Sequence, residues 1–490
     1  MTKNRKDKFS LSVKRFYDRS KLAAKILRSK RFERNMKKQS YVKGAIIISV
    51  GGFLSKLLGA VYRIPLVAYL GGEGMGIYQM VYPLYCILLT VSASGIPTGI
   101  ARLISSGGNA GAERKAFYLY GGIGLIGSLL MFALASPLAA AQGEADVALC
   151  CQLLSPSVFF VALISIVRGY FQGKGNMYPT AFTEVLEQAV KVAAGIALAG
   201  LFRGNVAKAT AAAVVAVTIS EIITCALAIA MYLGSRSRVK PLYRTPQASA
   251  KSIFAFTVPL TFTAIAMPVS QLVESIIVVN LLRGIADNAT ALYGIFSGCA
   301  VTIINLPVSV TYGLAAASVP NITPLAAKGD TDGARREVRK ALIYTALISV
   351  PFALALYIFA PLAARIIFPS LTAGEKELLI SLVRIMAINA VTSSLVQTSS
   401  ACITSLGKPL HGTITQWVTS TLRVALSAAL VAFTNLSITG VAVSANIAYL
   451  VAVVLNFWYI IVITHNKKGH GNVNHTDRLG SKGRGLNAVG

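Results

Sequence analysis

Ionisable side chains interrupt several long apolar stretches of the sequence, where a charge costs about 2.5–3.5 kcal/mol on insertion scales. Such residues normally face other protein groups or a water-filled cavity, so they are candidates for contact with an ion or a charged substrate. These candidates are Lys56, Arg63, Glu184, Glu187, Lys191, Glu221, Glu274 and Arg423.

Lys56 and Arg63 have the spacing of two residues on one face of a helix. Seven residues separate them along the axis by about 10 Å. Two cations on a hydrated face suit a pyrophosphate, which needs charge neutralisation before it crosses a region of low dielectric constant. The alternative is an internal salt bridge to a neighbouring helix.

Glu184, Glu187 and Lys191 follow the spacing i, i+3 and i+7, which again places them on one helical face. Glu187 and Lys191 have the favourable order of a helical ion pair, which leaves Glu184 as the freer carboxylate, a counter-ion or proton carrier. Glu221 is a candidate partner of Lys191 or Lys56, with a structural or a functional role. We predict substrate contact for Lys56, Arg63, Glu184 and Lys191.

Glu274 and Arg423 are single charges in two separate apolar stretches. A second cation site and an inter-helix salt bridge both explain them. The six cysteines show no C-x-x-C spacing, so the sequence predicts neither a disulfide framework nor a metal site. No cofactor is predicted, although transport coupled to a proton or a monovalent cation stays open.

The elements that carry these residues are membrane helices. The chain of 490 residues is 54% hydrophobic and only 13% charged, and its mean hydropathy is +0.64. Its apolar stretches reach 20 residues or more, enough to cross about 30 Å of hydrocarbon as helices, and they lack the alternation of barrel strands. The sequence predicts an all-α polytopic membrane protein with about twelve spans: 44–69, 76–104, 116–141, 147–172, 179–202, 208–233, 252–282, 291–317, 340–368, 378–405, 411–434 and 438–464.

The distribution of basic residues predicts the orientation of these spans. Alternate loops hold fifteen and five Lys or Arg residues, so the richer side is the cytoplasmic one and both termini lie there. Sixteen of the 47 Lys and Arg residues lie within residues 1–43. We expect this arm to contact anionic lipids of a bacterial cytoplasmic membrane rather than nucleic acid, because no basic–aromatic face accompanies the charge.

The two halves of the membrane region resemble each other. The segments SGIPTG (94–99) and ASVPNI (317–322) close the second and eighth spans, and FQGKGN (171–176) and TSLGKP (404–409) follow the fourth and tenth. This repetition predicts two six-helix lobes around a central site, as is usual in secondary transporters. The predicted organisation is a basic arm (1–43), a first lobe (44–233), a linker (234–251), a second lobe (252–464) and a disordered tail (465–490).

Four stretches carry a family resemblance: SKLLGAVYRIPL (55–66), LGGEGMGIYQMVYPLY (70–85), SGIPTGIARL (94–103) and RGYFQGKGNMYPTAFTEVLEQAVKV (168–192). Through them the chain resembles the multidrug/oligosaccharidyl-lipid/polysaccharide exporter superfamily, in the branch of stage V sporulation protein B and the MurJ-type lipid II flippases. The resemblance implies two lobes forming a V and a polyprenyl-pyrophosphate-linked sugar as cargo.

Lys56 and Arg63 match the cavity-facing basic residues that the resemblance implies for the first helix. The span 291–317 holds none of the arginines common in lipid II flippases, which leaves a related sporulation or surface-polysaccharide precursor open. We therefore expect a flippase for a lipid-linked oligosaccharide and not an enzyme, with cell-wall synthesis proteins as further candidate partners. The alternatives are a cation-coupled multidrug exporter, a membrane glycosyltransferase or polymerase, and an envelope-assembly scaffold.

Overall fold

Helices make up almost all of the described chain, as a backbone in lipid must satisfy its own hydrogen bonds. The computed structural model describes residues 41–94, 96–105, 110–235 and 250–465, and these ranges contain no strand. The predicted basic arm lies almost wholly outside the described residues, as do most of the predicted linker and the tail beyond 465. The domain boundaries therefore stay a prediction.

The first lobe consists of the elements that precede residue 236. They are α3 (Tyr41–Leu89), the π-helix η1 (Thr90–Ser94), α4 (Ile96–Ser105), α5 (Ala110–Gln142), α6 (Asp146–Gly173), α7 (Tyr178–Leu201) and α8 (Val206–Ser235).

The second lobe consists of the elements from residue 250 onward. They are α9 (Ala250–Arg283), α10 (Ala289–Gly294), the π-helix η2 (Ile295–Ala300), α11 (Val301–Ala327), α12 (Thr331–Ile358), α13 (Ala360–Ile367), α14 (Ala373–Ser405), α15 (Pro409–Phe433) and α16 (Ile438–His465).

Ten described helices are long and apolar enough to cross a membrane. One of them contains α3, which is broken at Gly71 (φ 65°), so its two arms correspond to the first two predicted spans. The helix α7 falls outside the ten, but it matches the predicted span 179–202 and carries Glu184, Glu187 and Lys191. With both arms of α3 and with α7, the ten helices account for the twelve predicted segments.

Several predicted boundaries are wrong: α5 begins at Ala110 rather than 116, and α11 ends at Ala327 rather than 317. The span predicted at 340–368 begins at Thr331, where the Asp330 side chain accepts a hydrogen bond from the backbone N–H of Gly333 and caps the helix. It then breaks at Phe359 into α12 and the short α13. Hydropathy marks only the part of a helix that lies in lipid, so a helical extension into water is missed.

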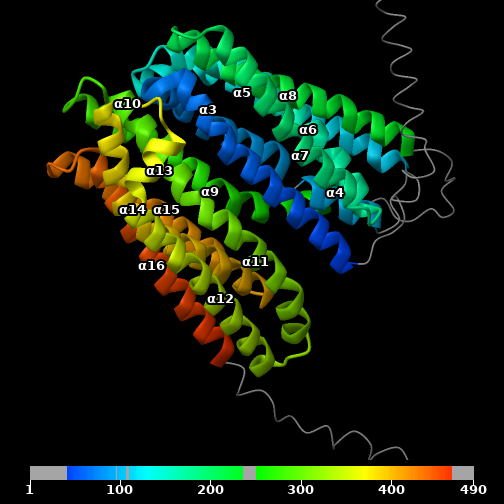
Figure 1. Ribbon diagram of the computed structural model, residues 1–490. Coiled ribbons are helices and arrows are strands. Elements are labelled where there is room, and N and C mark those ends of the chain that lie inside the picture. Colours follow the sequence, from blue (N-terminus) through cyan, green and yellow to red (C-terminus); the bar gives the residue numbers. More distant parts are fainter. Residues whose placement is uncertain (1–40, 95, 106–109, 236–249, 466–490) are drawn as a thin grey trace, which may run out of the picture.

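The two lobes diverge from one end of the molecule, which agrees with the V that the resemblance implied. Figure 1 shows the lobes side by side near α10 and α13 and separating toward α4 and α12. We call the end that holds Gly71, Gly143 and Gly284 the closed end. The largest cluster of buried side chains joins both lobes and includes Met75 from α3 and Phe296 from η2.

Glycines permit the close approach of α3 and α10 at the closed end. A Cβ atom on Gly76 would lie 2.1 Å from the carbonyl oxygen of Thr290, and one on Gly294 would lie 2.0 Å from the carbonyl oxygen of Gly72. Both obstructing atoms belong to backbone and cannot turn aside. The two lobes therefore meet here only because these positions lack side chains.

We predict that Gly76→Leu lowers the free energy of unfolding by about 1–3 kcal/mol, because the added side chain forces α3 and α10 apart. Thermal unfolding of the purified protein in detergent measures this effect. Gly52→Leu is the matched control in the same helix, since a Cβ there meets no atom within 4 Å. Equal stability of the two variants would contradict this account of the lobe contact.

Candidate functional site

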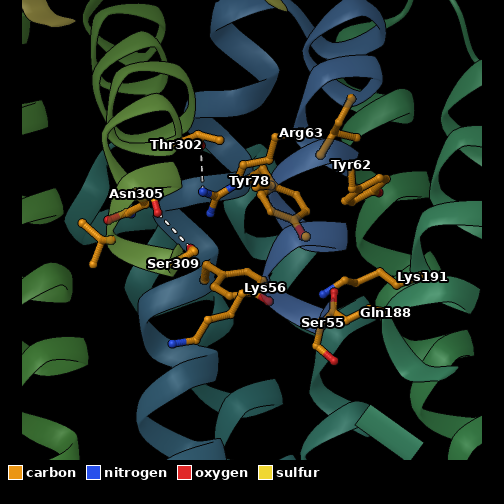
Figure 2. Close-up of a pocket in the computed structure, with 15 residues that line it drawn as sticks. Ser55, Lys56, Tyr62, Arg63, Tyr78, Gln188, Lys191, Thr302, Asn305 and Ser309 are labelled. Atoms are coloured by element: carbon orange, nitrogen blue, oxygen red, sulfur yellow. Dashed lines mark hydrogen bonds between the residues drawn. The ribbon is translucent and has the colours of Figure 1, made fainter. Parts of the chain in front are cut away.

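A polar cavity of about 430 Å³ lies where the two lobes face each other. The first lobe contributes α3 and α7 to its walls, and the second lobe contributes α11 (Figure 2). Its polar and charged lining residues are Ser55, Lys56, Tyr62, Arg63, Tyr78, Tyr82, Gln188, Lys191, Thr302, Asn305 and Ser309. The lining contains three cationic side chains and no carboxylate.

Lys56 and Arg63 both project from α3 into this cavity, as their spacing predicted (Figure 2). The Nζ atom of Lys56 lies 3.4 Å from the centroid of the Tyr312 ring, and Nη1 of Arg63 donates a 2.8 Å hydrogen bond to Oγ1 of Thr302. Tyr312 and Thr302 belong to α11 of the other lobe. Among the described residues neither cation forms a salt bridge, so the predicted alternative of an internal ion pair is not what the structure has.

Lys191 lines the same cavity from α7, and it forms no salt bridge among the described residues. Glu187 and Glu221 both interact electrostatically with it. The expected ion pair between Glu187 and Lys191 is replaced by a 3.0 Å salt bridge from Arg168 of α6 to Glu187. Helical spacing within α7 could not reveal this partner, because it comes from a neighbouring helix.

Glu221 is 2% exposed and interacts with Glu187, Arg168 and Lys191, so it belongs to a cluster of two carboxylates and two cations. No salt bridge joins Glu221 to Lys191 among the described residues, and Oε2 of Glu221 is buried without a hydrogen-bond partner, so their pairing stays a prediction. Glu184 does not line the cavity; it lies near Arg168 and Glu187 and close enough to Tyr312 to act on it electrostatically. Of the cations that line the cavity, Lys56 and Arg63 are the two whose described contacts are made with neutral groups of the second lobe.

Glu274 and Arg423 form an inter-helix salt bridge between α9 and α15. Nε and Nη2 of Arg423 donate to the two carboxylate oxygens of Glu274 at 3.0 and 2.6 Å, and Oγ of Ser427 donates to Oε1 at 2.9 Å. Glu274 is 1% exposed. Of the two predicted alternatives the structure has the salt bridge; a cation site stays a prediction, since both residues also line a cavity of about 280 Å³ together with Arg63.

The second lobe presents a polar face to the cavity that our sequence analysis missed. Thr302, Asn305, Ser309 and Tyr312 follow one another at helical spacing on α11, and three of them line the cavity while Tyr312 covers Lys56. The sequence does mark this face, because these uncharged polar residues share one side of an apolar span. The prediction from charged residues alone did not include them.

The lobes are joined at the closed end by a set of polar contacts that we call the latch: Gln142, Glu144, Ser275, Asn280, Arg283 and Thr290. Glu144 forms a salt bridge with Arg283 at 3.3 Å and accepts a 2.9 Å hydrogen bond from Thr290. The buried Gln142 donates to Oγ of Ser275 at 2.8 Å. Asn280 and Arg283 each donate to a backbone carbonyl of the first lobe. These contacts close one end of the space between the lobes.

The comparisons with known proteins agree with this architecture. The model of the polysaccharide biosynthesis protein family matches residues 41–326. The chain belongs to this family. The matched range covers the first lobe and the second lobe as far as α11, and therefore all three helices that contribute to the cavity.

Two relatives from Bacillus subtilis (strain 168) share part of the sequence. Stage V sporulation protein B is 30% identical over 59% of this chain and 59% of its own length. Lipid II flippase MurJ is 28% identical over 31% of each chain. The alignments thus span less than two thirds of these relatives. They confirm the family resemblance stated from the motifs.

The solved structures confirm the fold. An outward-facing multidrug resistance MATE family transporter of the MOP superfamily superposes with a TM-score of 0.66 at 17% identity, over 88% of this chain and 98% of that one. The named activities among the similar proteins are lipid flipping and transport rather than enzymatic chemistry. The chain is accordingly a multi-pass membrane protein with the fold of that transporter.

We predict that Glu274→Ala destabilises the protein by about 3–5 kcal/mol, because it leaves the Arg423 guanidinium buried without its carboxylate. Equilibrium unfolding in mixed detergent micelles measures the loss. The double variant Glu274→Leu/Arg423→Met removes both charges and should recover most of it. Glu337→Ala is the control, since its pair with Lys340 is exposed and worth about 0–1 kcal/mol. A small loss for Glu274→Ala would show that the pair is solvated.

We predict that Arg283→Gln shifts the protein toward conformations in which the closed end is open, because it removes the salt bridge of the latch. Spin labels on Leu201 and Phe433, which are both exposed, report the separation of the lobes. Double electron–electron resonance measures the distance between the two labels. Arg203→Gln is the control, because Arg203 faces only the Tyr69 ring among the described contacts. Identical distance distributions for wild type and Arg283→Gln would contradict the role of the latch.

Proposed function

We propose that the protein flips a polyprenyl-pyrophosphate-linked saccharide across the bacterial cytoplasmic membrane by alternating access. The observation that carries the proposal is the cavity between the lobes, with three cationic side chains and no carboxylate in its lining. The relative named lipid II flippase supports the class of cargo, and the family match supports a role in polysaccharide or cell-wall assembly.

The pyrophosphate is the part of the cargo that costs most free energy to move through the membrane without contacts to protein. An anion that enters a region of low dielectric constant must be paired and hydrogen-bonded. Lys56 and Arg63 supply positive charge whose present partners are a ring face and a neutral hydroxyl. A phosphate oxygen is a stronger acceptor for either cation than these groups, because its negative charge adds a Coulomb attraction that a ring face or a neutral hydroxyl lacks.

Binding at these two residues also acts on the contact between the lobes. The Lys56–Tyr312 and Arg63–Thr302 contacts each join α3 of the first lobe to α11 of the second. A pyrophosphate that takes over both cations releases these contacts. The head group would thus weaken the centre of the interface, and rocking of the lobes would expose it at the other end while the polyprenyl tail stays in lipid between the lobes.

The loop charges support an orientation for the cycle. With the closed end outside and both termini in the cytoplasm, the cavity would receive cargo from the cytoplasmic side. The basic arm 1–43 would hold the protein to anionic lipid. The charge cluster around Glu187 and Glu221 is the candidate for coupling to protons, because two carboxylates there share two cations.

The test is complementation and flipping with cavity variants. Lys56→Ala and Arg63→Ala should each slow flipping by about tenfold or more, since each removes a charge-assisted bond worth about 1.5–3 kcal/mol. Precursor accumulation in depleted cells and accessibility of labelled precursor in vesicles measure the rate. Lys56→Arg should retain most activity, and Arg203→Ala is a control outside the cavity.

The same vesicles separate flipping from drug export. Wild-type rates in both alanine variants would refute the cationic cavity mechanism. Export of a cationic dye at the wild-type rate in variants that lack Lys56 and Arg63 would favour the multidrug exporter instead. A positively charged drug gains no attraction from these two positively charged side chains.

A further inference from the structure

A second groove, of about 570 Å³, lies on the second lobe between α12 and α16. Both helices pack on α14 and touch each other little, so α14 forms its floor. The groove shares no residue with the central cavity. Figure 1 shows α16 along the edge of the second lobe that is far from α3, so the groove faces surrounding membrane rather than the other lobe.

The groove is charged at one end and apolar along its length. Its rim carries the exposed Arg335, Arg336 and Arg339 from the first turns of α12. Its walls and floor are built by side chains that are all apolar except one: Val338, Leu342, Ile343, Ala346, Leu395, Phe457, Ile460, Ile461 and Thr464.

The three arginines have no carboxylate partner among the described residues. Of the nearby acids, Asp330 caps α12 and Glu337 pairs with Lys340 at 2.8 Å, while Asp332 forms no salt bridge among the described residues. The described part of α16 contributes no charged side chain to the groove. Three guanidinium groups therefore meet at the head of an apolar channel.

We propose that this groove is a binding site for an anionic phospholipid. The phosphate of the head group contacts the three arginines, which are suited to bidentate phosphate binding. One acyl chain lies in the channel between Ile343 and Ile461. The apolar channel argues for a lipid over a free phosphate, and the positive rim argues for an anionic lipid over a zwitterionic one. The proposal stands independently of the proposed flippase activity.

The experiment titrates the purified full chain with dioleoyl phosphatidylglycerol or dioleoyl phosphatidylcholine and counts bound lipid by native mass spectrometry. We expect phosphatidylglycerol to bind at least about tenfold more tightly. The triple variant Arg335→Gln/Arg336→Gln/Arg339→Gln should abolish this preference. Lys328→Gln/Lys340→Gln/Lys408→Gln removes the same charge at the same end of the lobe but outside the groove, and it should retain the preference.

Two further variants cover folding and the acyl channel. If the triple variant does not fold, Arg339→Gln alone serves as the test. It should weaken phosphatidylglycerol binding by about threefold or more. Ala346→Trp should weaken both lipids, because it fills the channel. Thermal unfolding in phosphatidylcholine verifies that each variant is folded.

Several results would overturn the proposal. An equal loss of preference in both triple variants would mean general surface charge. Competition by glycerol phosphate as effective as that by the lipid would mean an ion site without an acyl channel. Binding of a polyprenyl phosphate that requires the same arginines, with no binding of phosphatidylglycerol, would assign the groove to another lipid. Wild-type preference in the Arg triple variant would remove the site altogether.

Discussion

The cost of a charge in a low-dielectric environment bears on where the ionisable residues of the described spans lie. Two solutions recur among them: the charge is paired within protein, or it faces a polar cavity. Glu274 and Arg423 take the first solution, with a bidentate contact in the second lobe. Arg168 and Glu187 take it in the first lobe. Lys56 and Arg63 take the second solution.

This division separates structural charges from functional ones. Glu274 and Arg423 bind each other, although both also line a cavity of about 280 Å³ that Arg63 shares. Lys56 and Arg63 instead carry full charges against neutral partners, and these partners belong to the opposite lobe. An anion that enters the cavity gains more from them than the protein loses, which is the condition for binding and for a change of conformation to be linked.

The sequence predicted the architecture well because hydropathy, loop charge and internal repetition all report on the membrane. It predicted the cavity pair because Lys56 and Arg63 lie on one helix, where spacing alone fixes their common face. It failed where partners come from different helices. The Arg168–Glu187 bridge replaced a pair expected within α7, and the fit of Gly76 against Thr290 depends on how α3 and α10 meet.

The break in α3 at Gly71 lies between the part of the helix that lines the cavity and the part that contacts the second lobe at the closed end. The arm before Gly71 carries Lys56 and Arg63, and the arm after it carries Gly76, which packs against α10 beside the latch residue Thr290. Gly71 itself has a positive φ and open space where a side chain would lie, so the bend meets no obstruction. Under the proposed function, a displacement of the first arm by cargo would reach the helix pair that holds the closed end. Because interfaces of packed helices switch between discrete arrangements rather than deforming continuously, a small shift at Arg63 would favour separation at Thr290.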